Sequence, residues 1–219
     1  MTTAKFEATP TQNEGIDLKE ISAENVKEAW KNYEAKPEFK EFNKHDMIES
    51  MQNLNDDEVA SPINIDEIDQ LELRLKTTLP VSLKIFYQTF GIADIGEELQ
   101  QFDDIGYLKD IWAAAPEYAP EFTSKDVEVL PHLITFSDYL GNGNMFCFHD
   151  ISKEVYYFDH DDRPYLAKIF DDVDEYLKCC LILLQSDLFG DATPDQVEQW
   201  VEDMVIELIG DQKLKKWRY

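Results

Sequence analysis

The residues best suited to chemistry in this sequence form one short polar run, Asp159-His160-Asp161-Asp162. Carboxylate oxygens and imidazole nitrogens are ligands that divalent metal ions prefer. The spacing fits no calcium-binding loop, because the Gly and the distal Glu that complete such a loop are absent. The same residue types are typical of a turn in which an Asp side chain caps backbone amides. We therefore expect a solvated, Asx-capped turn here and no metal site.

A second candidate is the neighbouring pair His149-Asp150, in which a carboxylate can orient an imidazole for acid–base catalysis. The sequence contains no nucleophile in a Gly-x-Ser-x-Gly elbow. We expect His149 to be a hydrogen-bonded residue at the end of a strand. A metal-dependent hydrolase that uses His149, Asp159, His160 and Asp161 is the catalytic alternative.

The run Gly141-Asn142-Gly143-Asn144 has glycines like those of a phosphate-binding loop. It lacks the Gly-x-Gly-x-x-Gly or Lys-Ser continuation, and no helix start follows it. We interpret it as a turn. Together the three motifs predict no catalytic residue, no cofactor and no bound metal.

These motifs belong to a stretch, residues 130–158, around which the chain is organised. Three short runs rich in β-branched and aromatic residues alternate with turn residues in it, and they are Leu133-Ile134-Thr135-Phe136, Met145-Phe146-Cys147-Phe148-His149 and Val155-Tyr156-Tyr157-Phe158. Such runs predict an antiparallel meander. Apolar residues occupy both faces of the first two runs. We therefore expect helices to cover one side of the sheet and the other side to present Tyr, His and Cys to a partner.

Two amphipathic helices are predicted before the sheet. Asn64 and Glu67 form a capping-box pattern that starts a helix running to Leu79. Pro80 fits the first position of the second helix, and Gly91 fits its end. The apolar stripes of the two helices are Ile68, Leu71 and Leu75, then Leu83, Phe86, Tyr87 and Phe90.

Other elements are expected on both sides of the meander. They are strands at residues 99–102, 107–112 and 165–170, a loop or single helical turn at residues 116–124, and two C-terminal helices. Asp171 or Asp172 caps the first of these helices. Thr193-Pro194-Asp195-Gln196 is a capping box for the second, which ends at Gly210 before a basic tail.

The chain is thereby divided into three parts. Residues 1–60 are expected to form a partly disordered, helical N-terminal extension, and residues 61–190 an α+β domain. Residues 191–219 are expected to add a C-terminal helix packed on that domain.

Negative charge is the strongest feature of the composition. Asp and Glu number 46 against 20 Lys and Arg, which gives a formal net charge of −26. Between residues 169 and 212, twelve acidic residues accompany a single basic one, Lys178. Such density costs stability through self-repulsion, but it attracts basic partners from a distance. It argues against nucleic acid and anionic membranes as partners. A surface that merely keeps the protein in solution is the simpler alternative.

The cysteines indicate a reducing compartment. Cys147, Cys179 and Cys180 form no disulfide framework and have no zinc-ligand spacing, so we expect buried thiols. Residues 1–17 lack the pattern of a signal peptide, and no stretch approaches the 18 apolar residues of a membrane span. We expect a cytoplasmic protein.

In the order of these signals the sequence resembles the SUKH superfamily, which includes bacterial immunity proteins and fungal cell-wall regulators. The resemblance covers residues 63–185 and rests on hydrophobic patterns with a few Gly and Asp. The matching segments are the helix from Ile65 to Leu79, the Leu79-Pro80 junction with Phe86 and Phe90-Gly91, Phe136-Ser137-Asp138 to Gly143, Met145-Phe146-Cys147-Phe148, Val155-Tyr156-Tyr157-Phe158-Asp159, and Ala167-x-Ile169-Phe170 to Leu177.

The resemblance implies an α+β fold with a twisted, mainly antiparallel sheet and helices packed on it, here with helical extensions at both ends. It implies no catalytic residues. It further implies an immunity protein that binds and neutralises a bacterial toxin domain, often a nuclease, by occlusion. A regulatory or scaffolding module of the same fold is the alternative. The acidic charge agrees with the first reading, because nuclease clefts are basic and opposite charges speed association.

We expect the partner to contact the meander and its turns. The candidate contact residues are Asp138, Asn142, Asn144, His149, Asp159, Asp161 and Asp162. The expected partner is a toxin domain with a basic protein surface, and neither nucleic acid nor a membrane. Tyr and Trp anchors are expected to supply affinity, while the acids supply association rate and selectivity.

Overall fold

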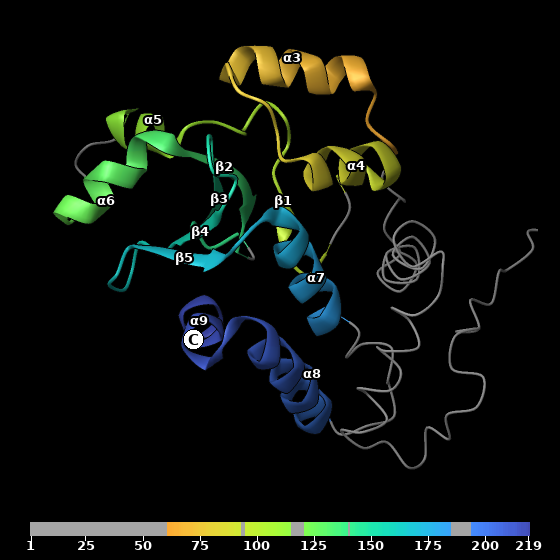
Figure 1. Cartoon of the computed structure of the whole chain (residues 1–219), viewed down its shortest axis with the longest axis vertical. Helices are drawn as coiled ribbons and strands as arrows, with labels where there is room; N and C mark the ends of the chain where they lie inside the picture. The colour runs from red at the N-terminus through yellow and green to blue at the C-terminus, as the bar shows by residue number, and fades with distance from the viewer. Residues whose placement is uncertain (1–60, 93–94, 115–120, 140, 185–193) are drawn as a thin grey trace, which may run out of the picture.

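The computed structural model describes residues 61–92, 95–114, 121–139, 141–184 and 194–219 (Figure 1). The expected N-terminal extension and the predicted capping residue Thr193 lie outside these ranges. In chain order the elements are α3 (Ile65–Leu75), α4 (Val81–Phe90), β1 (Glu98–Leu99), α5 (Leu108–Ala114), α6 (Ser124–Val129), the 3₁₀ turn η4 (Leu130–His132), β2 (Leu133–Asp138), β3 (Met145–His149), β4 (Val155–Phe158), β5 (Leu166–Phe170), α7 (Val173–Leu184), α8 (Pro194–Ile209) and α9 (Asp211–Arg218).

The sheet is an antiparallel meander whose strands lie in the order β1-β2-β3-β4-β5. In its centre, His149 of β3 pairs with Leu133 of β2, and Phe148 of β3 pairs with Val155 of β4. The predicted α+β fold and three central strands are confirmed. The strand predicted at residues 165–170 is confirmed as β5.

The connections between strands lie at two opposite ends of the sheet. One end carries the β2–β3 and β4–β5 turns, and we call residues 138–139, 141–144 and 159–165 the acidic end. The opposite end carries His132, which precedes β2, and the β3–β4 turn. We call His132 and residues 149–154 the histidine end.

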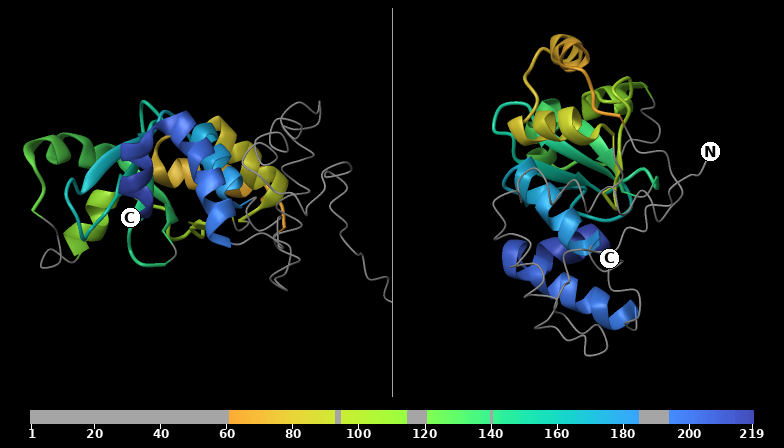
Figure 2. Two further views of the ribbon diagram at one scale, coloured as in Figure 1. Left: turned by 90° about the horizontal axis from the view of Figure 1, so that it is seen from below. Right: turned by 90° about the vertical axis from the view of Figure 1, so that its right-hand side faces the viewer.

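Helices cover both faces of the sheet. On one face α3, α4 and α7 pack against the larger hydrophobic core. On the other face α5 and α6 cover a smaller core, and Figures 1 and 2 show this pair of helices on the side of the sheet away from α4 and α7. Cys147 is fully buried in the smaller core. The expectation that one face presents Tyr, His and Cys to a partner is therefore wrong.

The second helical layer comes from a segment that was predicted incorrectly. Residues 107–112 were expected to form a strand, whereas Leu108–Ala114 is α5. Leu108, Ile111 and Trp112 pack on the smaller core at spacings of three and four residues, which is the period of one helix face. The aromatic and β-branched residues of the run obscured this period. Of the strand expected at residues 99–102, only Leu99 belongs to β1.

Signals at the helix starts are mostly confirmed, with small shifts, whereas α3 ends at Leu75, four residues before the predicted Leu79. The Asn64 side chain caps α3, but its oxygen accepts a hydrogen bond from the amide of Asp66, at 3.0 Å, and not from that of Glu67. Pro80 lies at the N-cap of α4, one position before the expected one. Gly91 ends α4 with a positive φ of 68°, which a glycine adopts without strain. Asp172 caps α7 by accepting the amide of Glu175 at 2.9 Å.

The C-terminal residues form two helices that close the core. α8 buries Val201, Met204 and Val205, whereas Leu208, three residues after Val205, is 42 % exposed. The basic tail expected after Gly210 is helix α9, which packs against β5. Its Trp217 is 1 % exposed and lies edge-on to Phe146 and Phe170, with ring centroids 5.7 and 5.3 Å away.

Replacing Trp217 by Ala should therefore destabilise the fold strongly. The change opens a cavity in the aromatic core and removes the 2.8 Å hydrogen bond from Trp217 Nε1 to the buried carboxylate of Glu97. We expect the free energy of unfolding, measured by urea denaturation, to fall by about 3–5 kcal/mol. Tyr219→Ala is the control, since Tyr219 is 87 % exposed, and it should cost less than about 0.5 kcal/mol. Equal costs for the two variants would contradict the packing role of α9.

Candidate functional site

The acidic end brings together six of the seven predicted contact residues. Met145 pairs with Phe158, so the β2–β3 turn and the β4–β5 turn start from neighbouring strand ends. Asp138 pairs with Met145 across β2 and β3. The residues gathered in this way are Asp138, Asn142, Asn144, Asp159, Asp161 and Asp162.

Asp159 organises the β4–β5 turn and is itself buried. Its Oδ1 atom accepts hydrogen bonds from the amides of Asp161 and Asp162, at 2.9 and 3.1 Å, which is the Asx-capped arrangement expected from the sequence. Its Oδ2 atom lies 2.6 Å from the Lys216 Nζ atom of α9. Burial alone would raise the pKa of the Asp159 carboxyl, but the Lys216 and backbone hydrogen bonds outweigh burial and lower it. Asp159 is thus a charged internal anchor and not part of the expected solvated surface.

Asn144 joins the two turns of the acidic end. Its side-chain oxygen accepts hydrogen bonds from the backbone amide of His160, at 2.9 Å, and from the ring Nδ1 of His160, at 2.7 Å. The Asn144 amide in turn donates to the side-chain oxygen of Asn142, at 2.8 Å. Asn144 is 7 % exposed, so it braces the surface rather than forming it.

The side chains left to meet a partner are the outer ones. Asn142 is exposed, and the side chains of Asp161 and Asp162 are 74 % and 83 % exposed. Asp138 is half-buried, and its Oδ1 atom accepts no hydrogen bond from the described residues. The acidic end therefore presents polar and charged groups on two turns whose backbones are fixed from beneath.

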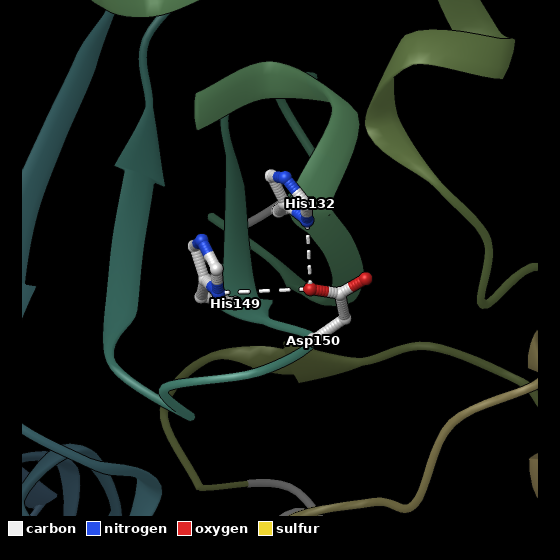
Figure 3. A group of neighbouring side chains, drawn as sticks. All are labelled: His132, His149 and Asp150. Carbon is white, nitrogen blue, oxygen red and sulfur yellow. Dashed lines mark hydrogen bonds and ion pairs between the residues drawn. The ribbon is translucent and has the colours of Figure 1, made fainter. Parts of the chain in front are cut away.

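His149, the seventh predicted residue, lies at the histidine end. Its Nδ1 atom is 3.6 Å from Asp150 Oδ1, and His132 Nδ1 is 3.0 Å from the same oxygen (Figure 3). The two rings stack with centroids 4.9 Å apart and planes inclined by 17°. Burial, followed by the charge of His132, lowers the pKa of His149 below its ordinary value. The expected strand-end histidine with a hydrogen-bonded environment is confirmed.

Sequence reasoning missed His132, although a signal for it existed. The meander pairs Leu133 with His149, so the residue before Leu133 must lie beside the residue after His149. The structure shows this directly, because the Asp150 amide donates to the His132 carbonyl at 2.8 Å. Finding His132 next to Asp150 required the residue-by-residue pairing of β2 with β3, and not only the prediction that both strands exist.

The residues of the expected hydrolase do not form one site. His149 is hydrogen-bonded to Glu154, just before β4, whereas Asp159, His160 and Asp161 follow the end of β4. At a rise of about 3.3 Å per residue, the two groups are roughly 16 Å apart along the strand. Catalysis that needs His149 together with Asp159 and its neighbours is excluded by this separation.

Part of the positive charge of the surface is paired with carboxylates of the protein itself. Several basic side chains form ion pairs with the protein's own carboxylates, namely Lys84–Glu72, Arg163–Glu121, Lys168–Glu154, Lys168–Asp171, Lys215–Asp211 and Lys216–Asp159. The exposed acids of α8 add Glu198, Asp203 and Glu207 to those of the acidic end. No helix among the described residues is long and apolar enough to cross a membrane.

A five-stranded antiparallel meander between two helical layers, with charged turns at one end, defines the class of the fold as an α+β domain. The family model described as SMI1 / KNR4 family (SUKH-1) matches residues 62–179, more than half of the chain. The chain belongs to this family, which is commonly associated with immunity proteins and whose domains are generally non-catalytic.

Two further comparisons define the limits of this assignment. A separate family model matches residues 1–62, so the N-terminal region is distinct from the SUKH-1 domain. No curated protein matches the chain. Helices α8 and α9 follow the matched segment, although Trp217 of α9 is part of the same core.

The Asp159–Lys216 pair should give stability that depends on pH. Because the folded-state pKa of Asp159 is lowered, its contribution is complete at pH 7 and is lost as the pH falls below about 4. Asp159→Asn should cost about 2–4 kcal/mol in urea unfolding at pH 7, and less at pH 3. Asp161→Asn, at an exposed position of the same turn, should stay within about 0.5 kcal/mol. A cost for Asp159→Asn that is the same at both pH values would contradict the ionised pair.

Proposed function

We propose that the protein is an immunity protein that binds a bacterial toxin domain with a basic surface, of the nuclease type, and neutralises it by occlusion. Membership of the SUKH-1 family carries the proposal. The formal net charge of −26 supports the basic character of the partner. Occlusion needs no catalytic group, in keeping with a family whose domains are generally non-catalytic.

Electrostatics explains how such a protein would find its target quickly. A nuclease cleft must attract phosphate groups, so it carries clustered Lys and Arg. An acidic surface of complementary shape occupies the same cleft and accelerates the encounter by long-range attraction. Ion pairs bind basic side chains such as Lys168 and Lys216 to carboxylates of the protein itself, which reduces their repulsion of a basic partner.

The acidic end is the surface that we assign to the toxin. Asn142, Asp161 and Asp162 are exposed on two turns that Asn144 and Asp159 hold in place. A surface that is already ordered loses little conformational entropy on binding, so more of the contact energy remains as affinity. Helices cover both sheet faces, which leaves the ends of the sheet as the places where strand turns reach the surface.

The kinetics of complex formation test the electrostatic part of the proposal. The toxin domain would be the one encoded beside this gene, with its catalytic activity disabled for handling. We expect a tight complex whose association rate constant, measured by stopped-flow fluorescence, falls at least tenfold between low and high salt. An association rate constant that does not change with salt would remove this part of the proposal. A gene neighbourhood without any toxin would favour a regulatory or scaffolding module.

A matched pair of double variants tests the location of the surface. Asp161→Asn with Asp162→Asn should lower the association rate constant several-fold and weaken protection of cells that express the toxin. Asp103→Asn with Asp104→Asn makes the same change in charge on a loop near Arg74, whose side chain donates to the Phe102 carbonyl away from the acidic end. The control pair should have a much smaller effect. Equal effects of the two pairs would show that only net charge matters.

A further inference from the structure

The histidine end concentrates three potential metal ligands on one short stretch of the sheet. His132 ends the 3₁₀ turn before β2, His149 ends β3, and Asp150 follows it. One ligand atom from each residue lies within 4.8 Å of the other two. Among the described residues, these three form a group of His and Asp side chains close enough together to hold one metal ion. Figure 3 shows that both imidazole rings direct Nδ1 toward the same carboxylate oxygen.

The separations between these atoms are close to those in a metal centre. Nδ1 of His132 and Nδ1 of His149 lie 3.0 and 3.6 Å from Asp150 Oδ1. Ligands that surround a tetrahedral ion at about 2.0–2.1 Å are themselves about 3.3 Å apart. The two imidazole planes are inclined by only 17° with centroids 4.9 Å apart, so both rings must turn about their side-chain bonds before their lone pairs can meet at one ion.

The backbone already fixes the ligands in position. The Asp150 amide donates to the His132 carbonyl at 2.8 Å, which ties the two ligand-bearing segments together. Lys153 Nζ donates to the carbonyls of Thr78 and Asp150, at 2.6 and 2.5 Å, and so anchors the β3–β4 turn. The backbone of the site is therefore held in place, and the rearrangement on filling is confined to the side chains.

Outer hydrogen bonds also suit a metal site. The Tyr107 hydroxyl shares its proton between the Leu75 carbonyl, at 3.2 Å, and Asp150 Oδ2, at 3.4 Å, and it does not contact Oδ1, which faces the imidazoles. The amides of Ile151 and Ser152 point at His149 Nδ1, at 3.2 and 3.3 Å, so this nitrogen carries a lone pair rather than a proton. A metal ion requires such a lone pair and would replace these two long hydrogen bonds.

We propose that His132, His149 and Asp150 form a binding site for one divalent transition-metal ion of the zinc class. Two imidazoles and one carboxylate suit Zn²⁺, Co²⁺ or Ni²⁺, whereas Mg²⁺ and Ca²⁺ prefer shells made of oxygen atoms. Three protein ligands leave a fourth position for water. The His132 side chain is 40 % exposed, so the ion can enter from solvent. Bound there, the ion joins the start of β2 to the β3–β4 turn. This site is independent of the toxin-binding proposal and lies at the other end of the sheet.

Calorimetric titration of the full chain with Zn²⁺, with Mg²⁺ as the comparison, tests the site. We expect one Zn²⁺ per chain with a dissociation constant in the micromolar range or lower, and a raised melting temperature. His132→Gln and His149→Gln should each weaken Zn²⁺ binding at least tenfold. Co²⁺ provides a second readout, because its visible absorption intensifies in tetrahedral coordination and should do so in the unaltered protein only.

His160→Gln is the matched control for these variants. His160 also lies beside a carboxylate, with Nε2 3.3 Å from Asp161 Oδ1, but the second imidazole is lacking there. This variant should keep full Zn²⁺ affinity. If either histidine variant at the site fails to fold, the Zn²⁺ affinity of Asp150→Asn is measured instead. This variant keeps the shape of the side chain and removes its charge, so it should also bind Zn²⁺ more weakly. Equal Zn²⁺ affinity in all the variants, or binding no tighter than that of Mg²⁺, would overturn the proposal.

Discussion

The pairing of β3 with both of its neighbours is the constraint on which the rest of the structure depends. Leu133 opposite His149, and Phe148 opposite Val155, decide which turns meet at each end of the sheet. Because side chains alternate between faces, a shift of one residue would turn the apolar groups of β3 toward the wrong layer. Cys147 points into the smaller core, while Phe146 and Phe148 belong to the larger one. One register therefore sets both cores and both sets of polar residues.

Two helical layers follow from this alternation. Thr135 and Cys147 pair across β2 and β3, and both are fully buried, so neither face of the strand pair meets water. α5 and α6 supply the missing cover, with Trp112 5.2 Å from Phe158 between ring centroids. Since the faces are closed, recognition of a partner has to use the ends of the sheet and the outer helix surfaces. The acidic end meets this requirement with carboxylates held on short, braced turns.

The sequence was sufficient wherever one local interaction decides the structure. Asn64 starts α3 through its own side chain, and Gly91 ends α4 through its own backbone conformation. Three short β-forming runs separated by turn residues can hardly form anything other than an antiparallel meander. It was insufficient where two signals competed, as in residues 107–112, where β-forming residue types masked a helical period. It was also insufficient for Lys216, whose partner Asp159 is 57 positions away and is found only in three dimensions.

The same distinction applies to the candidate site, of which residue types predicted one part and long-range contacts decided the other. That Asn142, Asp161 and Asp162 would lie on turns followed from residue type, and the register then placed them together. That Asn144 and Asp159 would be buried did not follow, because polar residues are buried only when specific partners satisfy them. His160 and Lys216 are those partners. His132 was missed for a similar reason, since its neighbour is defined by strand pairing and not by sequence distance.

The position of Trp217 has a consequence for how this domain is delimited. The segment matched by the SUKH-1 family ends at residue 179, yet the indole that covers Phe146 and Phe170 belongs to α9. A polypeptide shortened to the family boundary would leave these rings open to solvent beside an edge strand that has lost its neighbouring helix. Such a fragment would be prone to self-association through that edge. The hydrophobic core of this chain therefore extends well past its recognisable family segment.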